Sequence, residues 1–72
     1  MKGSEIVNKV KGYRNMINKT QEEMATILGV HVNTYKSWED NPSKFKIVEA
    51  NKFLEEVKKY DPNVKFEDIF LD

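Results

Sequence analysis

The chain of 72 residues has no cysteine, a single histidine and only three glycines. Without cysteine it can form no disulfide bond, no thiolate nucleophile and no cysteine zinc site. A single histidine, His31, excludes a metal site with several histidine ligands, and three isolated glycines form no phosphate-binding loop. No apolar run approaches the roughly 18 residues that a membrane span needs, and the first residues lead into no signal-peptide core. These absences favour a chain of a reducing cytoplasm.

An excess of charge of one sign is also absent, because 12 basic residues balance 12 acidic ones. This balance argues against non-specific coating of nucleic acid, for which a domain pI above about 9 is usual. The charge is nevertheless divided along the chain. Residues 1–46 carry eight basic and five acidic residues, whereas residues 47–72 carry four basic and seven acidic ones. The two parts either present opposite charges to different partners or are simply solvated surface.

The length predicts one small domain over residues 1–72, and it disfavours an enzyme. So short a chain rarely forms a water-excluding pocket in addition to its own core. The three serines, Ser4, Ser37 and Ser43, lie in no nucleophile-elbow context, and sequence places no partner beside His31. We therefore expect no catalysis, no cofactor, no metal, no small-molecule ligand and no membrane contact.

Apolar residues recur at helical spacing, which predicts an all-α, compact bundle of about five helices. The first helix follows a cap at Ser4, ends near Met16 and has one apolar face, formed by Ile6, Val10, Tyr13 and Ile17. The second opens with a capping box of Thr20 and Glu23 and stops at Gly29.

Three further helices are predicted after this pair. One covers residues 32–39 and turns Tyr35 and Trp38 inward. The next covers residues 47–59, with an inner face of Ile47, Ala50, Phe53, Leu54, Val57 and Tyr60. A short last helix covers residues 66–71, after a break at residues 61–63. No stretch shows the sustained alternation typical of a strand.

The spacing within residues 20–39 is typical of a helix-turn-helix, in which the second helix is presented to a DNA major groove. A small residue, Ala25, lets the two helices cross closely, and Gly29 permits a left-handed turn. The predicted core of the motif is Met24, Ala25, Leu28, Gly29, Val30, Tyr35 and Trp38.

The segment TQEEMATILGV, followed by TYKSWE, resembles the Cro/CI-type (XRE) helix-turn-helix family of small phage regulators. The resemblance extends over residues 7–71, since FEDIF is similar to the short last helix of small members from temperate phages. It implies a lambda-repressor-like DNA-binding domain with a central helix-turn-helix.

The resemblance also implies roles for individual residues. DNA or a protein partner would be contacted by Gln21, Val32, Asn33, Thr34, Lys36 and Ser37, and phosphates by Lys19, Thr20, Lys44 and Arg14. Arg14 matches the family arginine that pairs with a glutamate ending the third helix, here Glu39. Two positions depart from the pattern. Val32 stands where glutamine or arginine is common, and His31 stands where serine or threonine normally caps the helix.

Two functions follow from this resemblance. In the first, the chain is a DNA-binding transcription regulator that binds double-stranded operator DNA in the bacterial cytoplasm. It would act as a homodimer, with half-sites about one helical turn apart. The apolar residues of the C-terminal helix would form the dimer contact or part of the core: Phe66, Ile69, Phe70 and Leu71.

In the second, the chain is an antirepressor or co-repressor that binds the phage repressor protein and changes its affinity for DNA. Small phage modulator-of-repression proteins are similar in length and motif. An apolar contact would begin at an exposed Val32, Tyr13 or Met16, with Glu39, Asp40 or the acidic tail meeting basic residues of the repressor.

Overall fold

The computed structural model describes residues 9–71, and within this range the chain forms α-helices, one 3-10 turn and no strand. The helices are α1 (Lys9–Met16), α2 (Gln21–Leu28), α3 (Val32–Asp40), α4 (Ile47–Lys58) and α5 (Phe66–Phe70), and the 3-10 turn η1 is Pro42–Lys44. The predicted all-α bundle of about five helices is confirmed for these residues, and each boundary from the end of α1 onward lies within one residue of the expected one. The predicted cap at Ser4 and the first apolar position, Ile6, lie outside the described residues.

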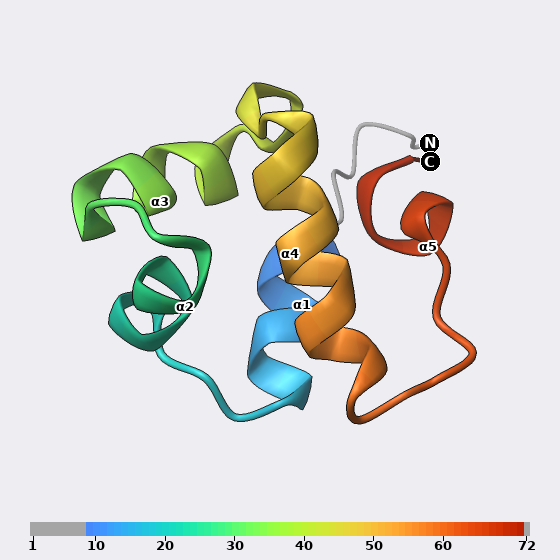
Figure 1. The fold of residues 1–72 in the computed structure, drawn as a ribbon. Coiled ribbons are helices and arrows are strands. Elements are labelled where there is room, and N and C mark those ends of the chain that lie inside the picture. Colours follow the sequence, from blue (N-terminus) through green and yellow to red (C-terminus); the bar gives the residue numbers. More distant parts are fainter. Residues whose placement is uncertain (1–8, 72) are drawn as a thin grey trace, which may run out of the picture.

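The longest helix, α4, runs through the middle of the molecule, with α2 and α3 on one side and α5 on the other (Figure 1). α2 contacts both α3 and α4, whereas α5 contacts α4 and α1. The first and last helices therefore pack together. A hydrogen bond joins them, since Lys9 Nζ donates to the carbonyl oxygen of Leu71 over 2.7 Å.

The turns that bound α2 follow from individual residues. α1 ends before Asn18, which adopts a left-handed φ of 59° that asparagine tolerates better than most residues. Thr20 then caps α2 by accepting from the backbone N–H of Glu23, and the Glu23 carboxylate accepts in return from the Thr20 N–H. At the other end Gly29 has φ 77°, which favours glycine. The predicted capping box and glycine stop are both confirmed.

The core consists of inward-facing residues from all five helices, from the turn after α1 and from the loop before α5: Val10, Ile17, Met24, Ala25, Leu28, Tyr35, Trp38, Ala50, Phe53, Val57, Val64 and Ile69. The expected core of residues 20–39 lies largely within this set, although Val30 is only half-buried and Gly29 is exposed. Phe45, between η1 and α4, links the helices, because its ring contacts those of Tyr35, Trp38, Phe53 and Phe70. One aromatic ring outside any helix thus joins α3, α4 and α5.

The predicted inner face of α4 is wrong at its two ends. Ile47 and Tyr60 are 65% and 56% exposed. Ile47 lies in the first turn, at the edge of the stripe formed by Ala50, Phe53 and Val57, and Tyr60 lies two residues beyond the end of the helix. Beyond Lys58 the helical period no longer determines which side chains face inward.

Candidate nucleic-acid interface

The outer side of α3 carries four exposed polar residues. Asn33, Thr34, Lys36 and Ser37 are all exposed, as the helical spacing predicts. Lys44 of η1 reaches the same surface, since its Nζ lies 3.4 Å from Ser37 Oγ. The structure therefore brings five of the predicted contact residues to α3 and the turn that follows it.

Val32 differs from this group. It is half-buried and packs against the hydrophobic core. Tyr13, which was expected with Val32 as an exposed apolar contact, also packs partly against the core. Met16 is the third apolar contact predicted with Val32 and Tyr13. It is the only one of the three that is exposed, at 50%. Val32 thus offers only part of its side chain to a partner on the α3 surface.

The start of α3 is fixed by His31. Its side chain is exposed, and its Nδ1 accepts a hydrogen bond of 3.1 Å from the backbone N–H of Asn33. This contact satisfies one of the free N–H groups of the first turn, which is the role of a serine or threonine cap. His31 therefore makes the cap contact that serine or threonine normally makes at this position.

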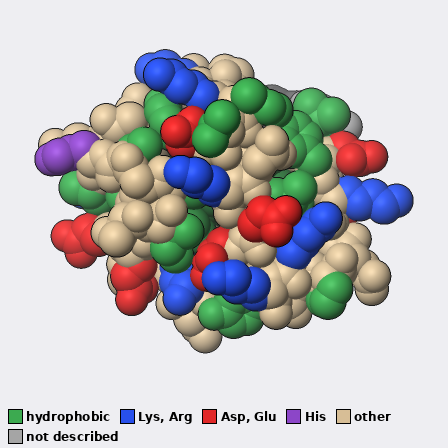
Figure 2. All heavy atoms as spheres, viewed as in Figure 1, with side chains coloured by type: hydrophobic (Ala, Val, Ile, Leu, Met, Phe, Trp, Pro, Cys, Tyr) green, Lys and Arg blue, Asp and Glu red, His purple; other side chains and the backbone are tan. Residues whose placement is uncertain are grey.

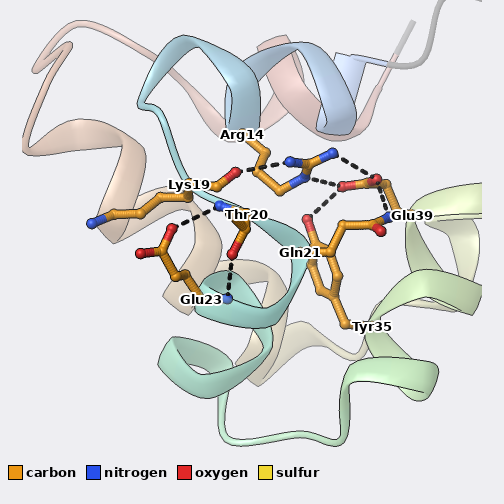
Figure 3. Close-up of polar contacts among 7 residues, drawn as sticks. All are labelled: Arg14, Lys19, Thr20, Gln21, Glu23, Tyr35 and Glu39. Atoms are coloured by element: carbon orange, nitrogen blue, oxygen red, sulfur yellow. Dashed lines mark hydrogen bonds and ion pairs between the residues drawn. The ribbon is translucent and has the colours of Figure 1, made fainter.

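The end of α3 is fixed by the buried carboxylate of Glu39 (Figure 3). Arg14 of α1 donates to it from Nε over 2.7 Å and from Nη2 over 3.2 Å. Gln21 Nε2 donates to Oε1 over 2.8 Å, and the Tyr35 hydroxyl donates to Oε2 over 2.7 Å. Side chains from α1, α2 and α3 thus converge on one carboxylate, and the predicted pair of Arg14 and Glu39 is present.

These contacts fix the charges of the cluster. Burial would raise the pKa of Glu39, but hydrogen bonds from Arg14, Tyr35 and Gln21 outweigh it and hold that pKa below its usual value. Burial, reinforced by the hydrogen bond to Glu39, raises the pKa of the Tyr35 hydroxyl. The hydrogen bond to Glu39 raises the pKa of Arg14 despite its burial. At neutral pH the cluster is a buried ion pair with a protonated tyrosine.

Two residues expected at the DNA surface are engaged in this cluster. The guanidinium of Arg14 is buried, and its remaining donor, Nη1, is 2.8 Å from the carbonyl oxygen of Lys19. Arg14 therefore has little surface for a direct phosphate contact. Gln21 is half-buried and turned toward Glu39 (Figure 3). Through Glu39, Arg14 links α1 to α3 and Gln21 links α2 to α3.

Thr20 and Lys19 lie beside the cluster, at the start of α2. The Thr20 side chain is committed to the capping box, and the carbonyl of Lys19 accepts from Arg14. Thr20 is exposed and Lys19 is half-buried. The two lysines expected to contact phosphates, Lys19 and Lys44, thus come from separate segments, one before α2 and the other after α3.

Sequence reasoning missed the contributions of Tyr35 and Gln21 to the cluster. Tyr35 was assigned to the core by its spacing, and its ring is indeed buried. Its position four residues before Glu39 also places the hydroxyl above the carboxylate, a signal that the i, i+4 rule could have supplied. Gln21 and Glu39 are 18 residues apart, and no local pattern predicts their contact.

Residues 9–71 contain no group of three acidic or histidine side chains placed to hold a metal ion. No helix within the same range is long and apolar enough to cross a bilayer. Comparison of the chain with models of protein families, with curated proteins and with solved structures gives no match in any of the three.

Proposed function

We propose that residues 20–39 form a helix-turn-helix of the Cro/CI kind, and that the chain is a transcription regulator acting on operator DNA through α3. The observation that carries this proposal is the exposed polar surface of α3, on a helix fixed at both ends. His31 caps its start and the Glu39 cluster holds its end. A rigid helix with exposed hydrogen-bonding side chains is suited to contacting base edges in a major groove.

Individual roles follow from the positions of these side chains. The Asn33 amide can make a bidentate contact with adenine, worth about 1–3 kcal/mol of discrimination. Lys44, beside Ser37, and Lys36 would contact phosphates on either side of that contact. Neither role requires a cofactor or a chemical reaction. The regulator would act in the cytoplasm of a bacterium that carries a temperate phage.

The charge available to DNA is small in this proposal. Arg14 is neutralised by Glu39, so of the cations predicted to contact phosphates Lys19 and Lys44 remain, and the proposal adds Lys36. Three such contacts give a slope of about −3 for the logarithm of the binding constant against that of the salt concentration. Specific binding by one chain is therefore expected to be modest and to fall moderately with salt.

The experiment is fluorescence anisotropy with the pure chain. The labelled duplex is the intergenic DNA beside its own gene, compared with a scrambled duplex at low and near-physiological salt. Asn33→Ala should weaken binding to the first duplex by about tenfold or more and leave the second unchanged. The matched control is Asn51→Ala, which removes an exposed amide on α4. Equal binding to both duplexes would contradict the proposal.

A second candidate is an antirepressor or co-repressor that binds a phage repressor protein. It is favoured by the pairing of Arg14 with Glu39 and by the mixture of basic and acidic side chains on the face shown in Figure 2. Such a surface suits a protein partner better than a polyanion. Sedimentation of the chain with the repressor encoded beside it separates the two functions. A complex that forms without DNA, together with equal weak binding to both duplexes, would favour this candidate.

A further inference from the structure

Asp40, the last residue of α3, lies on the same side of that helix as Asn33. The two residues are seven positions apart, which is almost two full turns and about 10 Å along the helix axis. Ser37 lies between them on that side, and all three residues are exposed. The buried residues of α3 face the opposite way. The polar surface proposed to meet DNA therefore ends in a carboxylate.

Within residues 9–71 the Asp40 carboxylate makes no hydrogen bond and no ion pair. A lysine lies four residues before it and another four residues after it, which are Lys36 and Lys44. Lys44 nevertheless contacts Ser37, with 3.4 Å between its Nζ and the Ser37 Oγ. The negative charge of Asp40 is therefore exposed to any partner that meets the outer side of α3.

Asp40 also lies at the end of the helix where negative charge is unfavourable. The free carbonyl groups of a helix C-terminus carry partial negative charge. The last turn of α3 contains no basic residue that would offset this charge. An acidic residue at this position therefore lowers the stability of α3 slightly. Since neither hydrogen bonding nor helix electrostatics accounts for Asp40, its effect is expected on the partner of α3.

We propose that Asp40 lowers the affinity of α3 for DNA by repelling phosphates, an inference that rests on the proposed function. A charge acts over about 8 Å at physiological ionic strength. The major groove is about 12 Å wide, so a carboxylate on the face that enters it lies within this range of phosphates on at least one strand. Phosphates carry no sequence information, so the repulsion acts on every duplex.

This repulsion offsets part of the attraction that the lysines supply. Asp40 weakens the sequence-independent part of binding and leaves the contact of Asn33 with a base edge unchanged. A larger share of the binding free energy then comes from base contacts. The chain thus depends on the bases that α3 reads more than its lysines alone would require.

The test uses the same anisotropy assay with Asp40→Asn, which removes the charge and keeps the size of the side chain. The variant should bind both duplexes about threefold more tightly at near-physiological salt, with a larger gain at low salt. Its salt slope should steepen by up to one, from about −3 toward about −4. The matched control is Glu55→Gln, which makes the same change in net charge at an exposed position on α4. It should leave both affinities nearly unchanged.

Three results would overturn the proposal. The first is an Asp40→Asn variant that binds DNA no more tightly than Glu55→Gln. The second is a gain confined to one duplex, because a phosphate effect must act on both. The third is unchanged DNA binding with a weakened repressor complex, which would favour the second candidate function. The proposed function is tested separately, since Asn33→Ala changes the difference between the duplexes and Asp40→Asn does not.

Discussion

Gln21 Nε2 donates a hydrogen bond of 2.8 Å to Glu39 Oε1, which ties the first residue of α2 to the last turn of α3. The angle between these two helices decides how the surface of α3 is presented. It is set by apolar packing near the turn and by this polar contact at the far end. Gln21 is therefore a positioning residue for the proposed interface.

Two substitutions of Gln21 distinguish the loss of its hydrogen bond to Glu39 from the addition of a negative charge beside Glu39. Gln21→Met keeps the length of the side chain and should lower the free energy of unfolding by about 1 kcal/mol. Gln21→Glu should cost more, because it sets a second carboxylate against Glu39. Urea denaturation followed by the fluorescence of Trp38, the single tryptophan, measures both. Equal losses for the two variants would contradict the contact.

Removing the charge of Glu39 should be the most damaging change in the cluster. Glu39→Gln leaves Arg14 buried without its counter-ion, and breaking a buried ion pair in this way costs about 3–5 kcal/mol. That is a large part of the stability of a small domain. The control Glu55→Gln changes an exposed glutamate on α4 and should alter stability little. Thermal unfolding by circular dichroism measures both variants.

The stability of the chain should depend on pH at both ends of the scale. The pKa of Glu39 is lowered from 4.5, so its contribution is complete above that value and is lost as pH falls through the folded-state pKa. The pKa of Tyr35 is raised from 10.0, so its contribution is complete below that value and declines as pH rises above it. Urea midpoints should therefore be highest between these limits.

Two variants check these assignments. Glu39→Gln should reduce the loss of stability in acid without abolishing it, because the backbone N–H of Thr20 also lowers the pKa of Glu23. Tyr35→Phe should remove the loss of stability in alkali. An unchanged alkaline profile in Tyr35→Phe would show that another group titrates there.

The two helix-associated glycines should respond in opposite directions to alanine. Gly29 has φ 77°, so Gly29→Ala should destabilise the chain by about 1–2 kcal/mol, although an added Cβ would meet only the flexible end of Lys52, 4.0 Å away. Gly12 lies inside α1 with nothing within 4 Å of an added Cβ. Gly12→Ala should therefore stabilise the chain by roughly 0.5–1 kcal/mol. Chemical denaturation of the pair tests both signs.

The cap at His31 can be tested by restoring the residue type expected there. His31→Ala removes the acceptor for the Asn33 N–H and should cost about 0.5–2 kcal/mol. His31→Ser supplies an equivalent acceptor and should recover most of that loss. If His31→Ala is as stable as the wild-type chain, the imidazole contributes no cap.

The helices and their boundaries could be predicted because their signals are local. Thr20 with Glu23 and the lone Gly29 act within a few residues, so their effects follow from the sequence itself. Spacing also identified Tyr35 and Trp38 as inward-facing, and the resemblance supplied the pairing of Arg14 with Glu39.

The features that sequence did not predict depend on contacts between distant residues. Val64 belongs to the core and Phe45 packs against it, but both lie outside helices, where periodicity indicates no face. The turn of Gln21 toward Glu39 depends on how α2 meets α3. The burial of the C-terminal residues also depends on tertiary contacts that sequence did not predict. Ile69 is core, whereas Leu71, two residues later, is exposed.

The packing of α1 against α5 also determines when the chain can complete its fold during synthesis. Lys9 is made early, and the carbonyl that its side chain contacts belongs to Leu71, 62 residues later. Until α5 leaves the ribosome, α1 lacks its partner helix, and the rings of Phe45 and Phe53 lack Phe70. Such distant contacts cannot form before both segments are available. The nascent chain must therefore keep an incomplete, apolar core accessible to chaperones until its last helix emerges.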